Sequence, residues 1–174
     1  MLVQLKSLRR ASFVSTKRPW FRAASTLSRA KVNGPDLAAR VENVEIGQKA
    51  AAERTFSQSD VLAFANVTGD HNPIHVDPNH GQAGPFFGKT VVHGMLSAGL
   101  IPALFAERLP GSIYASQTLS FQDAVFPGDT VRVEIEVEKK KTLRGTCLVQ
   151  CRTQVSHLDG RIAVTGSARV MLKV

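Results

Sequence analysis

The sequence has few cysteines and no apolar run long enough to span a membrane. Its two cysteines, Cys147 and Cys151, lie four residues apart in what reads as one strand. Their Cα atoms would then be ~13 Å apart, too far for a disulfide bond, so we expect packing residues rather than a redox pair. No stretch approaches the ~20 apolar residues of a transmembrane helix. These absences exclude an intrachain disulfide and a helical membrane span.

Acidic residues are missing from the first 31 residues, which hold eight of the 22 lysines and arginines. Residues 32–174 hold fourteen basic and fourteen acidic side chains, so the whole formal charge of +8 lies in the amino-terminal segment. A nucleic-acid-binding domain would keep its basic excess on the fold, which argues against that function. The Arg- and Ser-rich composition of residues 1–31 predicts a transit peptide, mitochondrial or plastid, with a disordered basic arm as the alternative.

The remaining chain reads as a linker over residues 32–43 and one domain over residues 44–174. The domain begins with a strand pattern at residues 49–56, followed by a short helix that Ser57 caps and that ends near Gly69. A glycine-rich loop with an apolar tip follows at residues 79–90. Its aromatic residues could form a packed lid or an interface, or a functional cover over a pocket.

Residues 91–109 form the longest apolar element, which predicts a helix buried around most of its circumference and ended by Pro110 and Gly111. Beyond it the pattern alternates between apolar and charged residues, as in a half-buried strand. Strand patterns cover residues 112–122, 131–138, 145–157 and 161–173. Turns are expected at residues 127–129 and 159–160. The predicted fold class is α+β, an antiparallel sheet wrapped around one buried central helix.

The segment from Gly69 to Pro78 places a carboxylate and an imidazole five residues apart, at Asp70 and His75. Gly69 permits a tight turn, and Pro73 and Pro78 disfavour regular helix. We therefore expect a rigid, irregular loop that aims both side chains at one spot. An acid and a base that converge in this way can activate water.

This segment resembles the hydratase 2 motif of the MaoC-like enoyl-thioester hydratases, which have the hot-dog fold. The matching positions are Gly69, Asp70, Asn72, Pro73, His75, Asp77 and Pro78. Two later stretches, residues 91–96 and residues 120–121 followed by 126–129, resemble the same family in the right order and spacing. The resemblance covers roughly residues 44–172. It implies a hot-dog fold and a homodimer with each active site near the subunit boundary.

The resemblance also implies an activity, the reversible hydration of a trans-2-enoyl thioester to the (R)-3-hydroxyacyl thioester. Asp70 and His75 would hold and deprotonate the water, and the Gly94 backbone N–H would polarise the thioester carbonyl. We expect acyl-CoA or acyl carrier protein as the substrate carrier, and no other cofactor. Supporting roles are expected for Gly69, Asn72 and His93. Weaker candidates for contacts to the coenzyme A phosphates or to an acidic carrier protein are Lys89, Arg108 and Arg144.

Each of these residues has a structural alternative. Asp70 could cap backbone amides in a turn, and His75 could be a core histidine that a carbonyl satisfies. A zinc or iron site is a rival for the cluster of Asp70, His71, His75, Asp77 and His80. Pro73 prevents a two-histidine helical face and no cysteine is near, so we expect no metal.

Two helix positions bear on the family comparison. Ser97 is a weak candidate for the nucleophile of a Ser-His-Asp triad, because no nucleophile-turn motif surrounds it. Pro102 stands where several family members have a serine eight residues after the helix glycine, which puts a hydroxyl role at that position in doubt.

The sequence thus predicts a hydro-lyase. Its leader favours one role, the 3-hydroxyacyl-acyl carrier protein dehydratase of mitochondrial fatty-acid synthesis. An (R)-specific enoyl-CoA hydratase of fatty-acid degradation is the first alternative. A hot-dog thioesterase and a non-catalytic acyl-binding subunit are the others. The site residues leave chain length, carrier and physiological direction open.

Overall fold

The computed structural model describes residues 27–38, 40–80 and 88–174. Its strands form one antiparallel sheet of six in the order β1-β2-β4-β5-β6-β3. They are β1 (Ser28–Ala30), β2 (Lys49–Thr55), β3 (Ile113–Phe121), β4 (Thr130–Leu143), β5 (Thr146–His157) and β6 (Ile162–Lys173). The helices are η2 (Val41–Asn43, a 3-10 turn), α1 (Gln58–Thr68), α2 (Pro73–Val76), α3 (Gly94–Ala98) and α4 (Leu100–Arg108).

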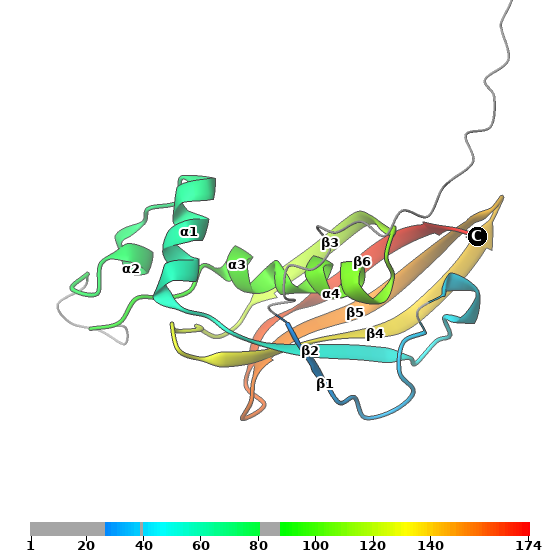
Figure 1. Ribbon diagram of the computed structural model, residues 1–174, viewed down its shortest axis with the longest axis horizontal. Helices are drawn as coiled ribbons and strands as arrows, with labels where there is room; N and C mark the ends of the chain where they lie inside the picture. Colours follow the sequence, from blue (N-terminus) through cyan, green and yellow to red (C-terminus); the bar gives the residue numbers. More distant parts are fainter. Residues whose placement is uncertain (1–26, 39, 81–87) are drawn as a thin grey trace, which may run out of the picture.

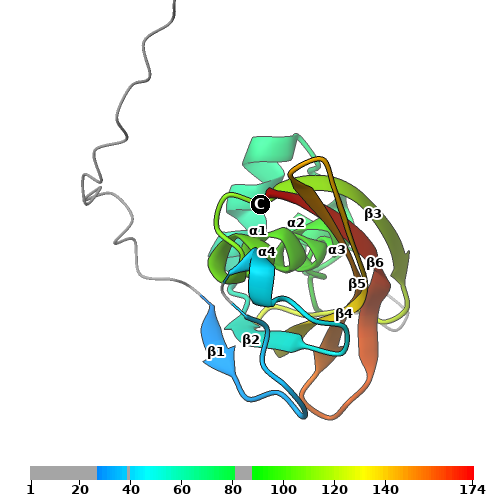
Figure 2. The same ribbon diagram turned by 90° about the vertical axis from the view of Figure 1, so that its right-hand side faces the viewer.

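The sheet curls around α3 and α4, while α1 and α2 lie together at one end of the molecule (Figures 1 and 2). Val131, Val133 and Ile135 of β4 alternate toward the helix and are fully buried. Leu104 and Phe105 of α4 belong to the same core cluster. The predicted α+β fold, with an antiparallel sheet around a central helix, is confirmed, because the period-2 pattern of β4 buries one face only.

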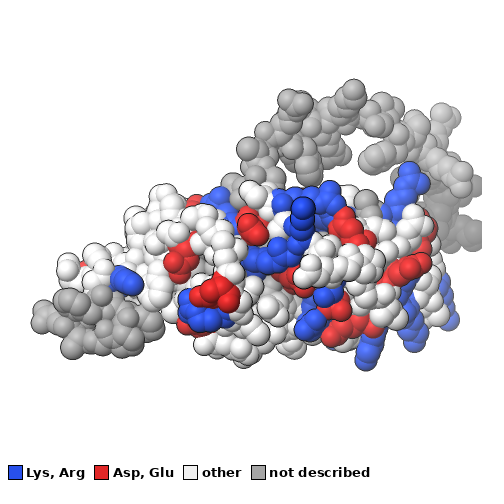
Figure 3. Space-filling view, turned by 90° about the horizontal axis from the view of Figure 1, so that it is seen from below, with Lys and Arg blue, Asp and Glu red and all other residues white. Residues whose placement is uncertain are grey.

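The outer face of the sheet is charged and balanced. Lys49 lies 3.8 Å from Glu134 and 3.4 Å from Glu136 on the neighbouring strand, and Arg132 lies 3.6 Å from Glu53. Figure 3 shows basic and acidic side chains interspersed over the face that it displays. This pairing agrees with the zero net charge of residues 32–174.

The central helix begins at Gly94 and continues from α3 into α4, because Gly99 keeps right-handed helical angles (φ −60°, ψ −18°). It ends at Arg108, with Leu109 as the C-cap, before Pro110 as predicted. The expectation that most of its circumference is buried was wrong for this single chain. Pro102, Ala103, Ala106 and Glu107 are exposed, because the sheet covers one side of the helix only.

The α1 helix has the termini that its sequence predicts. The Ser57 hydroxyl accepts a hydrogen bond from the Asp60 N–H, and the Asp60 carboxylate accepts one from the Ser57 N–H, which is a capping box. Gly69 ends the helix in the left-handed conformation, with φ +79°.

The predicted irregular loop after Gly69 is wrong in one detail, because it contains the helical turn α2. Pro73 is the first residue of that turn, where its fixed φ favours the helix and its missing N–H costs nothing. Asn72 caps the turn, and its side chain accepts a hydrogen bond from the Ile74 N–H.

The amino-terminal boundaries remain predictions, since residues 1–26 lie outside the described residues, as does the predicted loop tip at 81–87. Part of the predicted leader, Ser28–Ala30, pairs with β2. Leu37 and Val41, from the segment expected to be a linker, are buried in the core. The Lys140 ammonium donates to the main-chain carbonyls of Glu42 and Val44 and ties this segment to β4.

The two cysteines lie on β5 as buried, free thiols, as the sequence predicts. Burial raises the pKa of the Cys151 thiol to about 12, which keeps it protonated and unreactive. No helix in the described part of the chain is long and apolar enough to cross a bilayer.

Candidate active site

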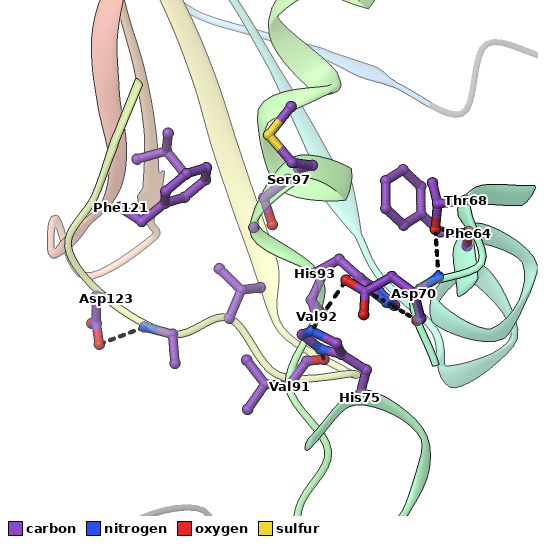
Figure 4. Close-up of a pocket in the computed structure, with 15 residues that line it drawn as sticks. Phe64, Thr68, Asp70, His75, Val91, Val92, His93, Ser97, Phe121 and Asp123 are labelled. Carbon is purple, nitrogen blue, oxygen red and sulfur yellow. Dashed lines mark hydrogen bonds and ion pairs between the residues drawn. The ribbon is translucent and has the colours of Figure 1, made fainter. Parts of the chain in front are cut away.

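A cavity of about 620 Å³ opens between the start of α3, the α1–α2 region and the connection from β3 to β4 (Figure 4). Two main-chain hydrogen bonds join its walls. The Val91 N–H donates to the Ile74 carbonyl, and the Val92 N–H donates to the Val125 carbonyl. The lining residues are Phe64, Thr68, Asp70, His75, Val91, Val92, His93, Gly94, Met95, Ser97, Phe121, Asp123, Ala124, Val125 and Val164.

His75 stands in the cavity wall with one ring nitrogen held and the other free. Its Nδ1 lies 2.7 Å from the Val91 carbonyl oxygen. A carbonyl only accepts, so Nδ1 carries the proton and the Nε2 of the neutral ring offers its lone pair. The side chain is 15% exposed. The contact fixes both the tautomer and the direction of the free nitrogen.

Asp70 faces that free nitrogen. Its Oδ1 accepts a hydrogen bond from the Asn72 N–H at 3.3 Å, which orients the carboxylate. Its Oδ2 lies 4.0 Å from His75 Nε2, and the side chain is 52% exposed. This separation is too long for a direct hydrogen bond and suits one water that donates to both atoms.

His93 contacts both Asp70 and His75 and supports their positions. It is 2% exposed, and its Nε2 donates to the Asp70 main-chain carbonyl at 3.0 Å. Its ring stacks on His75 with centroids 3.8 Å apart and lies 5.0 Å from the Phe64 ring. His93 is also the N-cap of α3. Its contacts to Asp70 and His75 were missed, because they join segments about 20 residues apart.

Gly94 is the first residue of α3, so its N–H has no acceptor inside the helix. A Cβ at this position would lie 2.7 Å from Cε1 of Phe121. The missing side chain therefore admits the Phe121 ring beside the helix start and leaves the backbone N–H accessible from the cavity. Phe121 ends β3, so two of the three sequence motifs meet here.

The three candidate phosphate contacts are not gathered at the cavity. Lys89 lies two residues before the cavity-lining Val91, with its ammonium 5.1 Å from the centre of the Phe126 ring. Arg108 donates to the Asp36 carboxylate at 2.6 Å and to the Leu37 carbonyl. Arg144 lies in the β4–β5 turn with φ +50°, and Figure 1 places that hairpin at the opposite end of the sheet from α2. Neither arginine lines the cavity.

Of the five residues considered from the sequence as an alternative metal site, two, Asp70 and His75, belong to a cluster of possible ligands in the structure. Asp70, His75 and His93 bring possible ligand atoms within 4.8 Å of one another among the described residues. However, His93 Nε2, the nitrogen nearest the Asp70 carboxylate, carries a hydrogen and donates it in a hydrogen bond to the Asp70 main-chain carbonyl. A metal ligand needs a lone pair there. The arrangement therefore suits proton transfer better than metal binding.

The comparisons with known proteins point to one family. Residues 41–158 match the family described as "MaoC like domain". The chain belongs to the MaoC-like domain family. It is 40% identical over 133 residues to the (R)-specific enoyl-CoA hydratase of Aeromonas caviae, covering 75% of this chain and 97% of that protein. It is 35% identical over 129 residues to the mitochondrial 3-hydroxyacyl-[acyl-carrier-protein] dehydratase FERN of Solanum lycopersicum, covering 74% of this chain and 78% of that protein.

The solved structures agree with this membership. The (R)-hydratase from A. caviae involved in PHA biosynthesis superposes with a TM-score of 0.69 at 37% identity, covering 75% of this chain and 98% of that one. The MaoC-like domain thus has the predicted hot-dog fold. The relatives are named for hydration and for dehydration, which are two directions of one reaction class. The chain is accordingly an enzyme of the hydro-lyase class.

Proposed function

We propose that this MaoC-like domain catalyses the reversible hydration of trans-2-enoyl thioesters to (R)-3-hydroxyacyl thioesters. The observation that carries the proposal is the free Nε2 of His75, held 4.0 Å from Asp70 Oδ2 in the wall of a largely apolar cavity. An acyl chain fits such a cavity, and water activation needs such a pair. The names of the relatives support the same reaction class.

In the hydration direction, one water donates its two hydrogens to Asp70 Oδ2 and His75 Nε2. Its lone pair then faces the β-carbon of the enoyl group. As the new C–O bond forms, one proton passes to the pair, and the electrons of the double bond move toward the thioester carbonyl. The pair then returns a proton to the α-carbon on the same face. The residues leave open which member of the pair removes the proton.

Negative charge builds on the thioester oxygen during this addition. We assign its stabilisation to the Gly94 N–H, because that group opens the central helix and has no acceptor within it. The positive end of the helix dipole adds to the effect. Since Gly94 carries no side chain, the thioester can approach its backbone closely.

For the biological role, we propose the 3-hydroxyacyl-acyl carrier protein dehydratase step of mitochondrial fatty-acid synthesis, in the matrix and as a homodimer. The acid-free leader and two plant relatives named as mitochondrial dehydratases, of tomato and Arabidopsis thaliana, support this role. The 40% identity to an enoyl-CoA hydratase favours the second candidate, an (R)-specific hydratase that acts on acyl-CoA.

Thioester hydrolysis and acyl binding without catalysis are the remaining alternatives. Hydrolysis would direct water at the carbonyl carbon, whereas the proposed site delivers water from the Asp70–His75 pair to the β-carbon. A binding protein has no need of a histidine whose tautomer is fixed with a free nitrogen toward the cavity. Both features favour hydration.

The test is the ultraviolet absorbance of crotonyl-CoA with the wild-type protein and with Asp70→Asn. We expect the wild type to remove the enoyl absorbance and the variant to be slower by about 10²–10⁴-fold. A release of free thiol instead would identify a thioesterase. If neither signal changes, the same assay with an enoyl-acyl carrier protein separates a strict carrier requirement from a binding role. Full activity of Asp70→Asn would overturn the proposed site.

A further inference from the structure

One polar group in the cavity wall has no role in the mechanism above. Ser97 of α3 is 1% exposed, and its hydroxyl has no hydrogen-bond partner among the described residues. A buried hydroxyl without a partner costs about 1–3 kcal/mol and is uncommon in folded proteins. Ser97 also lines the cavity, so its hydroxyl lies in the wall that a bound molecule would face.

The helix itself does not offer Ser97 a partner. A serine inside a helix commonly donates to the carbonyl four residues earlier, which is that of His93. That oxygen already accepts the N–H groups of Leu96 at 3.0 Å and of Ser97 at 3.1 Å. A carbonyl oxygen has two lone pairs, and both are engaged. The Ser97 hydroxyl is thereby left for a partner outside the helix.

The position of Ser97 relates it to the helix start. Residues three apart share one helix face, so Ser97 lies one turn behind Gly94 on the same face. Side chains in a helix tilt toward its amino terminus, which carries the hydroxyl back toward the Gly94 N–H. In Figure 4 the Ser97 oxygen points from α3 toward the space between Phe121 and His93.

We propose that the Ser97 hydroxyl is a second hydrogen-bond donor to the thioester carbonyl oxygen, beside the Gly94 N–H. This inference rests on the proposed function. The oxygen has two lone pairs, and two donors on one helix face can each take one. The hydroxyl keeps its proton throughout, and its hydrogen bond strengthens as negative charge builds on the oxygen. Ser97 is then a catalytic residue of the hydration reaction.

The kinetic test compares the full-length wild type, Ser97→Ala and Ser156→Ala on crotonyl-CoA. Ser156 is a serine of β5 with 8% exposure that does not line the cavity, so it controls for the loss of a nearly buried hydroxyl. We expect Ser97→Ala to lower kcat/KM by at least about 10-fold, up to the ~10²–10³-fold of a lost oxyanion donor, mainly through kcat. Ser156→Ala should match the wild type. Ser97→Cys keeps the side-chain size with a weaker donor and should fall between Ser97→Ala and the wild type.

A spectroscopic measurement reports the contact itself. Infrared difference spectra of bound hexadienoyl-CoA give the frequency of the thioester carbonyl, which each hydrogen bond lowers. We expect a higher frequency in Ser97→Ala than in the wild type, and an unchanged one in Ser156→Ala. If Ser97→Ala does not fold, the same comparison is made with Ser97→Cys.

The outcomes separate the two proposals. An active wild type whose rate and carbonyl frequency survive the loss of the Ser97 hydroxyl overturns the role of Ser97 and leaves the proposed function standing. Tighter binding and an undiminished kcat in Ser97→Ala, as expected of a purely apolar wall, overturn it equally. A wild type without hydration of either an enoyl-CoA or an enoyl-acyl carrier protein overturns both.

Discussion

The sheet and the described residues between Gly69 and Gly94, which are residues 70–80 and 88–93, are held together in different ways. In the sheet, β4, β5 and β6 pair over long registers, and their inward residues are buried one after another. In the segment, a few single hydrogen bonds set the geometry. His75 is held by the Val91 carbonyl, and the Asp70 backbone is held by His93.

This difference separates stability from activity. Many apolar contacts stabilise the sheet together. Truncation of one buried side chain there therefore removes part of the folding free energy and leaves the site in place. In the site segment each hydrogen bond orients one reacting group, and a half-exposed side chain such as Asp70 contributes little to the core. Mutations in the two regions should therefore change different observables.

The largest effect is expected from His75→Gln. Glutamine retains an amide that can donate to the Val91 carbonyl but offers no basic nitrogen to the water. We expect kcat/KM to fall by about 10²–10⁴-fold, which is roughly 3–5 kcal/mol of barrier, with little change in the midpoint of thermal unfolding.

The control for this variant is His71→Gln, because His71 is an exposed histidine four residues away that does not line the cavity. It should keep wild-type kinetics. A large loss of activity in His71→Gln, or an active His75→Gln, would show that the two histidines have been assigned the wrong roles.

The converse effect is expected from Ile135→Ala in the middle of β4. Ile135 is fully buried opposite the central helix, so truncation leaves a cavity that costs about 2–5 kcal/mol of unfolding free energy. Urea unfolding measures this loss. The activity per folded molecule should stay near that of the wild type under conditions where the variant is folded. A variant of unchanged stability and reduced kcat would contradict the separation of the two regions.

The sequence predicts the two regions unequally well. Alternation in β4 and the Ser57 and Gly69 signals of α1 depend on neighbours along the chain, and the structure confirms them. Asp70 and His75 could be singled out because one short motif carries both. The bracing by His93 and the packing of Phe121 on Gly94 could not be predicted, since they join separate segments. The exposed side of α4 was missed because periodicity does not reveal how far a sheet wraps a helix.

The smallest effect is expected at the start of α1, where a local signal can be tested by pH. The Ser57 N–H donates to the Asp60 carboxylate and holds its pKa below the usual value, and the Ser57 hydroxyl and Arg54 act in the same direction. A carboxyl whose pKa is lowered on folding stabilises the native state above its unfolded pKa, about 3.9. That stabilisation is lost as the pH falls through the folded pKa.

Asp60→Asn should therefore lower the unfolding free energy by about 1 kcal/mol at pH 7, a typical value for a helix cap. The difference from the wild type should shrink below about pH 4 and vanish once Asp60 is protonated in the folded protein. Urea unfolding at pH 7, 5, 4 and 3 measures it, with Glu107→Gln on the exposed side of α4 as the control carboxylate. A difference that persists unchanged at pH 3 would mean that the Asp60 charge does not stabilise α1, and hydration activity at pH 7 should be the same in all three proteins.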